Sequence, residues 1–284
     1  MTNTTLDPEV LTRWIGNSEQ REDVIHLQPA LFMQATLDSA PSLKHGDCLP
    51  LGWHWLYFLE ARPMSELGRD GHPVVGGFLP PVALPRRMWA GSRLEFHHPI
   101  RIGDTLKKTS TITDLEIKSG KTGKLCFVTV SHIFYRDQLK LVSEEHDIVY
   151  REDPAPGTLP PSPPIAPMDA QIQKSVHPSS VLLYRYSALT FNGHRIHYDI
   201  YYCRDVEGYP GLVFHGPLSA TLLLDLASAA TDAEQISSFE FRAISPLFAD
   251  RPFTLNLKTN DNKLALWTAN PDGLLAIKAS ASLR

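Results

Sequence analysis

The stretch His215–Thr231, HGPLSATLLLDLASAAT, decides which fold this sequence predicts. Pro217 suits the first turn of a helix, and Leu218, Leu222 and Leu226 recur at helical spacing. Leucine and alanine fill most of the remaining positions, so the helix is apolar almost all round. Such a helix is expected in a core rather than on a surface.

Strand-like segments follow this helix, and turns rich in Asn, Asp, Pro and Gly join several of them, which is typical of hairpins. The apolar and aromatic richness of Ser180–Phe191 predicts a further strand before the helix. Together these patterns predict an antiparallel sheet curled around one buried helix. The predicted strands after the helix are Ile236–Arg242, Phe253–Thr259, Leu264–Ala269 and Leu274–Leu283.

The first half of the chain repeats this order of elements. Leu51–Ala61 is aromatic helical material, and Ser119–Gly123 reads as a turn between strands. Leu94–Phe96 (LEF) echoes Phe239–Phe241 (FEF), and each precedes a proline and then an aspartate. The shared order favours a duplicated α+β unit. The predicted strands here are Arg93–His98, Leu106–Ile117, Leu125–Tyr135 and Lys140–Tyr150.

Seven of the 23 prolines fall between Pro154 and Pro167. Proline lacks a backbone N–H, so this run predicts an extended spacer rather than a strand or helix. We therefore expect an N-terminal half over residues 1–152, a linker over 153–176 and a C-terminal half over 177–284. The alternative is a long surface loop within one domain.

The composition excludes several classes of protein. With 27 basic and 31 acidic residues, the net charge of −4 argues against a nucleic-acid partner. No apolar run reaches the ~18 residues of a spanning helix, and the N-terminus lacks the apolar stretch of a signal peptide. The three cysteines show no CxxC pair. We expect a reduced cytoplasmic protein without a membrane partner.

Candidate catalytic residues cluster in Thr190–Asp199, TFNGHRIHYD, where Gly193 would allow a sharp turn. An imidazole of His194 or His197 has a pKa suited to acid–base chemistry. His215 and Gly216 begin the buried helix, whose free N–H groups could bind an oxyanion. The alternatives are an exposed His194, a His215 that only caps its helix, and a metal at His194 and His197 with Asp199. Extended backbone would point the two imidazoles apart, which disfavours the metal.

These residues resemble the MaoC-like (R)-specific enoyl-CoA hydratases, whose D-x-N-P-x-H segment precedes an H-G at the head of a central helix. Leu79–Gly91 and His98–Asp104 are similar to the first half of the double-hotdog members. The resemblance implies an α+β double hotdog, with two antiparallel sheets each wrapped around a central helix. It also implies that the second half carries the catalytic loop and that the first half is a wall for the substrate.

The chain departs from the family motif at two positions. Asn192 replaces the family's Asp, and His194 replaces its Asn. Because an amide takes no proton at neutral pH, Asn192 can only orient the water. This leaves His197 as the principal acid and base, helped by His194 or by an acid from elsewhere. Asp199 either orients His197 or forms a salt bridge, and the resemblance assigns the thioester oxygen to the N–H of Gly216.

The subgroup that the chain resembles implies hydration of a coenzyme A thioester whose branched acyl group carries a second carboxylate, as in mesaconyl-C4-CoA or itaconyl-CoA, to give citramalyl-CoA. A cation must then bind that carboxylate, or else the phosphates of coenzyme A. No metal or other cofactor is implied, and pairing of chains as a homodimer is left open. The candidates for this binding are Arg86 and Arg87 with the neighbouring Trp89, and Arg195 and Arg204.

Three other functions stay open at this point. The first is dehydration of a (3R)-hydroxyacyl thioester in fatty-acid metabolism. The second is thioester hydrolysis, for which Asp225 is the one acid within the predicted central helix. The third is a non-catalytic module that binds acyl thioesters, which the Asn192 substitution permits.

Overall fold

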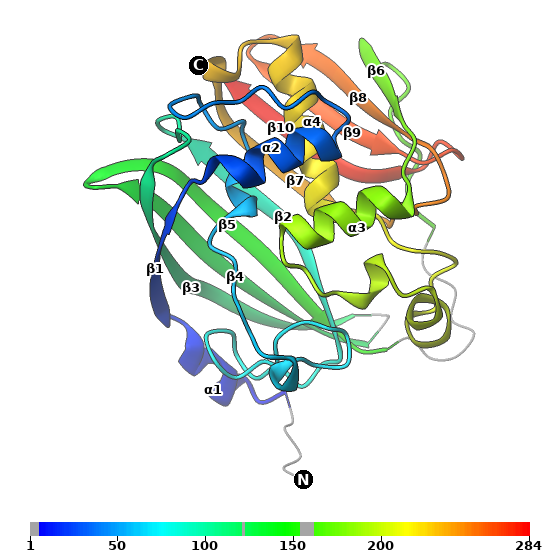
Figure 1. Cartoon of the computed structure of the whole chain (residues 1–284). Coiled ribbons are helices and arrows are strands. Elements are labelled where there is room, and N and C mark those ends of the chain that lie inside the picture. Colours follow the sequence, from blue (N-terminus) through cyan, green and yellow to red (C-terminus); the bar gives the residue numbers. More distant parts are fainter. Residues whose placement is uncertain (1–5, 121–122, 154–161) are drawn as a thin grey trace.

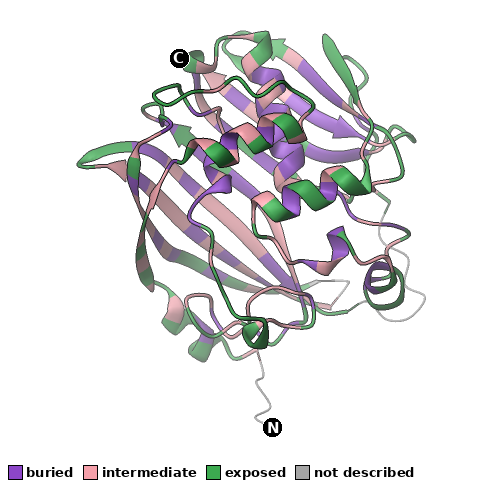
Figure 2. Cartoon of the chain, in the orientation of Figure 1, coloured by how far each residue is buried: buried purple, intermediate pink, exposed green. Residues whose placement is uncertain are grey.

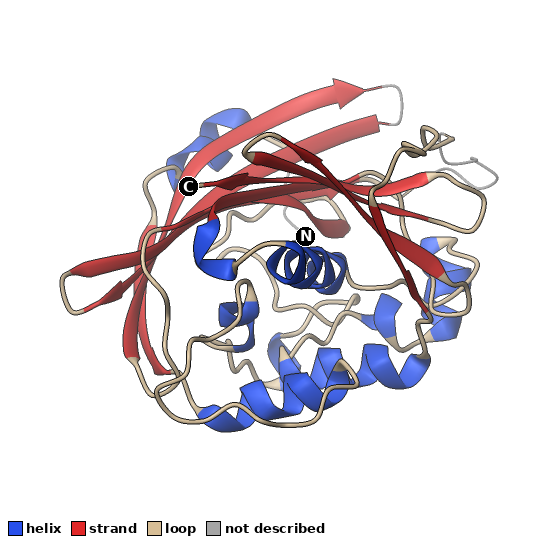
Figure 3. Cartoon of the chain, turned by 90° about the horizontal axis from the view of Figure 1, so that it is seen from above, coloured by secondary structure: helices blue, strands red, loops and turns tan. Residues whose placement is uncertain are grey.

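The computed structural model describes residues 6–120, 123–153 and 162–284. Its strands form one antiparallel sheet that curves over a central helix, while the other long helices lie further out on the same side (Figures 1 and 3). Ten strands build this sheet in the described part of the chain: β1 (Ser18–Val24), β2 (Arg86–Phe96), β3 (Thr105–Gly120), β4 (Gly123–Arg136), β5 (Leu139–Arg151), β6 (Ile172–Val176), β7 (Ile236–Ala243), β8 (Phe253–Asn260), β9 (Lys263–Ala269) and β10 (Leu275–Leu283).

The strand order reveals the duplication. Across the sheet it runs β1-β3-β4-β5-β2-β7-β10-β9-β8-β6. Read inward from either edge, the order is the same if β1 corresponds to β6, β3 to β8, β4 to β9, β5 to β10 and β2 to β7. The two halves meet where β2 pairs with β7, from Gly91 opposite Arg242 to Glu95 opposite Ser238. The repeated order agrees with the predicted duplicated α+β unit.

The central helix of the second half is α4 (Gly216–Ala230), which confirms the helix predicted at His215–Thr231. It lies against β7, β8, β9 and β10, and most of its surface is buried (Figure 2). Leu218, Leu223 and Leu224 are fully buried in the main hydrophobic cluster. A helix apolar on nearly every side is stable here because sheet covers one side and the outer helices and loops cover the other.

The corresponding place in the first half holds no long helix. Leu51–Ala61, expected as helical material, forms only the 3₁₀ turn η2 (Trp53–Leu56). Gly52 precedes this turn at φ +80°, a conformation that glycine adopts readily. The remaining short elements are α1 (Pro8–Leu11), η1 (Thr12–Trp14), η3 (Met64–Glu66), η4 (Arg195–His197), the π-helical turn η5 (Tyr202–Glu207) and η6 (Ala233–Gln235).

Two outer helices occupy matching places, α2 (Leu27–Thr36) after β1 and α3 (Ser180–Leu189) after β6, and they contact each other. The prediction of a strand at Ser180–Phe191 is therefore wrong. The Ser179 hydroxyl accepts a hydrogen bond from the N–H of Leu182 at 3.1 Å, which caps the helix. The buried positions Leu183 and Tyr186 are three residues apart, so the apolar residues follow a helical and not a strand period.

Other boundaries differ from expectation as well. The strand predicted at Arg93–His98 begins earlier, because residues 86–89 already belong to β2, whose pairing with β5 starts at Arg86 opposite Arg151. The described residues leave out 121–122 of the turn expected at Ser119–Gly123. They also leave out 154–161, which hold most of the proline run Pro154–Pro167. Within the expected linker 153–176, residues 172–176 form β6 and pair with β8. The domain boundaries themselves stay a prediction. No helix in the described ranges has the length and hydropathy needed to cross a membrane.

Asp225 allows a test of how α4 is packed. Burial raises the pKa of Asp225 to about 7, and nearby Trp53 and Lys174 offset this only in part. Because the pKa is raised in the folded state, the protonated group favours folding below the unfolded pKa of ~3.9, and this contribution is lost as the pH rises through 7. We expect Asp225→Asn to stabilise the protein by roughly 2–4 kcal/mol at pH 8 and far less at pH 4.5. Urea unfolding at both pH values measures this, and equal effects at the two would contradict it.

Candidate active site

The loop that follows α3 brings the histidines of the TFNGHRIHYD segment into the interior. Phe191 ends the helix in the left-handed region at φ +48°. The Asn192 side-chain oxygen then accepts a hydrogen bond from the N–H of His194 at 3.0 Å, which turns the chain into η4. His194 and His197 are both buried, so the exposed-loop alternative for His194 is excluded. The amide oxygen of Asn192 is engaged in shaping this loop.

A loop of the first half docks onto this segment through two glycines. A Cβ atom on Gly71 would lie 2.0 Å from the carbonyl oxygen of Gly193, and one on Gly193 would lie 2.7 Å from the oxygen of Gly71. The N–H of Arg195 donates to the carbonyl oxygen of Asp70 at 2.8 Å. Gly193 was expected to permit a sharp turn, but its φ is not positive, and its role is to allow this close backbone approach.

His197 is held as a neutral base. Its Nδ1–H donates to the carbonyl oxygen of Val213 at 2.8 Å, which leaves Nε2 without the proton when the ring is neutral. Burial lowers the pKa of His197 to about 4, although the Val213 carbonyl acts in the opposite direction. The ring stacks on His215 with centroids 3.6 Å apart and stands edge-on to His194 at 5.5 Å.

His215 supports this stack from the N-cap position of α4. It is fully buried, and its Nε2 forms a hydrogen bond of 2.8 Å with the Ser187 hydroxyl. Its Nδ1 has no hydrogen-bond partner within the described residues. Gly216 is the first residue of α4, and apart from its chain neighbours and the backbone of its own helix no described atom lies within 4 Å of where its Cβ would be. The N–H groups of this first turn lack intrahelical acceptors and can therefore bind an anion.

Asp70 and His72 complete the site, and neither was predicted from the sequence. The Asp70 carboxylate accepts hydrogen bonds from His72 Nδ1 at 2.8 Å and from the His72 backbone N–H at 3.0 Å. The His72 ring lies 4.2 Å from that of His194. Four imidazoles, contributed by both halves, thus follow one another in the order His72, His194, His197 and His215. The only signal for them in the sequence is an acid and a histidine two residues apart, Asp70 and His72. This pair becomes part of the site only because its loop docks beside His194.

The charges at this site favour neutral imidazoles beside one carboxylate. Burial lowers the pKa of His194 to about 2, and it also lowers the pKa of His72. Burial alone would raise the pKa of Asp70, but the hydrogen bonds and charge of His72 hold it well below its usual range. Asp70, His72 and His194 also offer ligand atoms within 4.8 Å of one another, a spacing that could hold a metal ion. In the structure the Asp70 carboxylate binds His72 directly, which is how a carboxylate orients a catalytic imidazole.

Three other predicted site residues face away from the histidines. Arg195 binds the Asp199 carboxylate through Nε and Nη2, at 3.1 and 2.7 Å, and stacks over the Tyr202 ring. Of the two roles considered for Asp199, the structure shows the salt bridge, and within the described residues its carboxylate forms no hydrogen bond with His197. Arg204 is exposed, and its Nε donates to the carbonyl oxygen of Pro210.

The predicted residues of β2 separate into three environments. Arg86 is buried, and its guanidinium binds Asp153 at 2.9 Å and Glu207 at 3.1 Å, so it is engaged within the protein. Arg87 points the other way, and its charge lowers the pKa of both His72 and His194. Within the described residues Arg87 forms no salt bridge. Trp89 shares the face of Arg87 but lines a separate pocket of the first half.

Comparison with known proteins identifies relatives over nearly the whole chain. The family model for hydroxyacyl-thioester dehydratase type 2 matches residues 52–249. A mesaconyl-C4-CoA hydratase of Chloroflexus aurantiacus is 46% identical over 271 residues, which cover 95% of this chain and 96% of that protein. A mitochondrial hydroxyacyl-thioester dehydratase type 2 of Schizosaccharomyces pombe is 29% identical over 76% of this chain and 79% of its own length.

Solved structures agree on the fold. A MaoC-like dehydratase from Phytophthora capsici superposes with a TM-score of 0.72 at 12% identity, covering 98% of both chains. A protein of Mycobacterium tuberculosis described as a double hotdog superposes with a TM-score of 0.56 at 14% identity, covering 95% of this chain and 96% of the other. The predicted α+β double hotdog is therefore confirmed, with the two halves joined into one sheet.

The environment of His197 leads to a measurable titration. Because burial lowers its pKa to about 4, the ring should stay neutral from pH 8 down to about pH 5, whereas an unperturbed histidine titrates near 6.5. NMR of histidine-labelled protein measures this, with His197→Gln identifying the resonance. A midpoint between pH 6 and 7 would show that the ring is solvated.

Proposed function

The chain belongs to the hydroxyacyl-thioester dehydratase type 2 family, and from this we propose that it is a hydro-lyase that adds water to mesaconyl-C4-CoA to give citramalyl-CoA. The relative at 46% identity, which covers nearly all of both chains, carries this proposal because it is a mesaconyl-C4-CoA hydratase. The substrate is then a coenzyme A thioester with a second, free carboxylate on a short branched acyl group. No metal or redox cofactor is needed, because adding water requires only acid–base groups and an oxyanion site.

His197 and His72 share the proton transfers in this proposal. The unprotonated Nε2 of His197 accepts a proton from water as the hydroxyl oxygen bonds to the β-carbon of the thioester. His72 takes the place of the family's missing Asp, because Asp70 orients its ring and stabilises the positive charge that a transferred proton places on it. The proton then passes from His197 to His72 and from there to the α-carbon, so that the elements of one water molecule are added overall. His194 lies between the two rings, and its lowered pKa keeps it uncharged there.

The first turn of α4 stabilises the charge that develops on the thioester oxygen. Gly216 offers its N–H at the positive end of a fifteen-residue buried helix, and the space beside it is open. One donor of this kind contributes roughly 2.7–4 kcal/mol to transition-state stabilisation in other enzymes.

Arg87 is the residue proposed to bind the distal carboxylate. It lies close enough to His72 and His194 to influence their protonation, and Arg86 beside it is already paired with Asp153 and Glu207. A guanidinium can bind a carboxylate through two parallel hydrogen bonds, which fixes orientation as well as charge. This would place the reacting double bond between Arg87 and the α4 terminus.

Dehydration of a (3R)-hydroxyacyl thioester is the second candidate, because the family model and the yeast relative carry that description. We also propose that the enzyme is cytoplasmic, which its three free thiols, Cys48, Cys126 and Cys203, support. Pairing of two chains as a homodimer and a place in itaconate breakdown are proposals of the same kind.

Steady-state kinetics with mesaconyl-C4-CoA and crotonyl-CoA tests the proposed function. Wild-type enzyme should prefer mesaconyl-C4-CoA, and His197→Ala should lower kcat by about 10²–10⁴ with little change in KM, because it removes the acid–base group. Arg87→Gln should lower kcat/KM for mesaconyl-C4-CoA by about tenfold or more and leave crotonyl-CoA almost unaffected. Activity should survive removal of divalent metals by a chelator.

Two outcomes would contradict the proposal. Faster wild-type turnover of crotonyl-CoA would support the second candidate, and release of free thiol would indicate thioester hydrolysis.

The paired variants Asp70→Asn and Asp199→Asn test the role of the first-half loop. Asp70→Asn should lower kcat by about 10–100-fold, because His72 loses the carboxylate that stabilises its charge. Asp199→Asn weakens the half-exposed pair with Arg195 but keeps an oxygen that can accept from the N–H of Tyr202, and it should stay near the wild-type rate. The reverse ranking in the same assay would show that the catalytic carboxylate is Asp199.

A further inference from the structure

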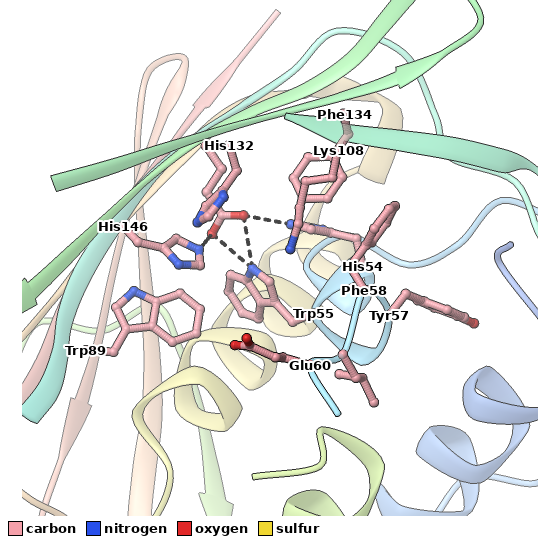
Figure 4. A pocket seen from close by; sticks show the side chains of 12 residues that line it. His54, Trp55, Tyr57, Phe58, Glu60, Trp89, Lys108, His132, Phe134 and His146 are labelled. Carbon is pink, nitrogen blue, oxygen red and sulfur yellow. Dashed lines mark hydrogen bonds and ion pairs between the residues drawn. The ribbon is translucent and has the colours of Figure 1, made fainter. Parts of the chain in front are cut away.

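A pocket separate from the four histidines of the candidate active site lies in the first half, on the concave side of its sheet. Its volume is about 230 Å³. For comparison, a cavity of about 150 Å³ in another protein holds a benzene molecule. Leu59 lines the pocket and is exposed, so the pocket reaches the surface there. Its walls combine several aromatic side chains with charged and imidazole groups from η2 and the sheet (Figure 4).

The pocket occupies the place that a helix fills in the other half. In the second half, α4 packs against β7, β8, β9 and β10. Their counterparts in the duplicated strand order are β2, β3, β4 and β5, and each of these contributes to the pocket lining. Because the first half has only η2 where the second has α4, the space above this sheet is left partly open.

The concave faces of the two halves differ in chemistry as well. Under α4 the strands present apolar residues such as Leu255, Leu266 and Ala279. The first-half strands present Lys108, His132, Glu144 and His146 to the pocket. Buried polar groups cost free energy unless they are paired. If this face of the sheet only had to be closed off where the helix is missing, apolar side chains would do so more stably. The polar face therefore points to a ligand.

Glu144 organises the polar wall without being free to bind. It is only 1% exposed and accepts hydrogen bonds from His54 Nε2 at 2.9 Å, from Trp55 Nε1 at 2.9 Å, and from His146 Nε2 (Figure 4). Burial alone would raise the pKa of Glu144, but His146 and His54 hold it well below its usual range. Three N–H donors thus saturate the carboxylate and fix the rings of both histidines.

Lys108 is the cation of the pocket that remains available. Its ammonium group points into the space and lies 5.2 Å from the centroid of the Phe58 ring (Figure 4). It forms no salt bridge or hydrogen bond with any residue that the structure describes. The other acid of the lining, Glu60, is engaged by Arg21 and Arg62 at 3.4 and 2.6 Å. Burial lowers the pKa of Lys108, a cost that a bound anion would remove.

We propose that this pocket is a second binding site, for a small carboxylic acid with a flat apolar body, whose carboxylate pairs with Lys108 while its body packs against the corner formed by Trp55 and Trp89. The two indole rings stand 5.1 Å apart in an edge-on arrangement and form one corner of the space. The group bound there comes from a free acid or from the acyl end of a thioester, and the two sources share the same chemistry.

Binding of benzoate tests the site, with benzamide as its uncharged counterpart. Isothermal titration calorimetry on the full-length protein should show benzoate binding more tightly than benzamide, and the tryptophan fluorescence should change because Trp55 and Trp89 line the pocket. Lys108→Gln should weaken benzoate binding at least about tenfold and leave benzamide unchanged, as expected for loss of a charge-assisted hydrogen bond. Lys107→Gln, the neighbouring lysine on β3, is the matched control and should bind benzoate like the wild type.

Three further measurements keep the result interpretable. Lys108→Arg should restore most of the affinity, which a variant weakened only by misfolding would not do, and circular dichroism compares the folding of all variants. Benzoate that binds unchanged to His197→Ala saturated with mesaconyl-C4-CoA identifies a free-acid site, whereas competition identifies the acyl end as the occupant. Absence of benzoate binding to wild-type protein, or equal affinity in Lys108→Gln, would overturn the proposal whether or not the enzyme hydrates mesaconyl-C4-CoA.

Discussion

The arrangement of the four site histidines depends on a direct backbone contact between Gly71 and Gly193, with no side chain between them. At 2.0 Å, the position of a Cβ on residue 71 overlaps the carbonyl oxygen of Gly193, so the loop of the first half can reach the catalytic loop only if residue 71 is glycine. This contact, together with the hydrogen bond from the N–H of Arg195 to Asp70, places His72 beside His194. The proposed catalytic site is therefore a property of the duplicated chain, because neither half carries all four imidazoles.

Much of the fold followed from sequence patterns because these patterns report local physics. The leucine and alanine spacing of α4 and the turns between β8, β9 and β10 depend on neighbouring residues alone. The prediction of a strand at Ser180–Phe191 is wrong because many apolar residues suggest a strand, whereas the buried positions of α3 follow a helical period. The early start of β2 at Arg86 could not be anticipated either, since the partner that fixes it, Arg151, lies 65 residues away.

For the site, the motif in the second half and the head of α4 could be recognised from sequence, while the contribution of the first half could not. Asp70 and His72 lie more than 120 residues before His194, and only the docked loops bring them together. Conversely, Asp199 is adjacent to the motif in sequence but pairs with Arg195. Sequence alone also could not separate the neighbours Arg86 and Arg87 on β2. Arg86 forms ion pairs inside the protein, whereas Arg87 lies near the histidines.

The pairing of β2 with β7 has a consequence for how the molecule meets other proteins. A sheet edge carries unpaired N–H and C=O groups that can recruit strands from other chains. Joining the halves edge to edge removes two such edges, and within the described residues the remaining ones are β1 and β6, with seven and five residues. Short terminal strands are a recognised protection against aggregation. Joining the two halves has thus paired two aggregation-prone edge strands with each other, and the edges that remain in the described sheet are short strands.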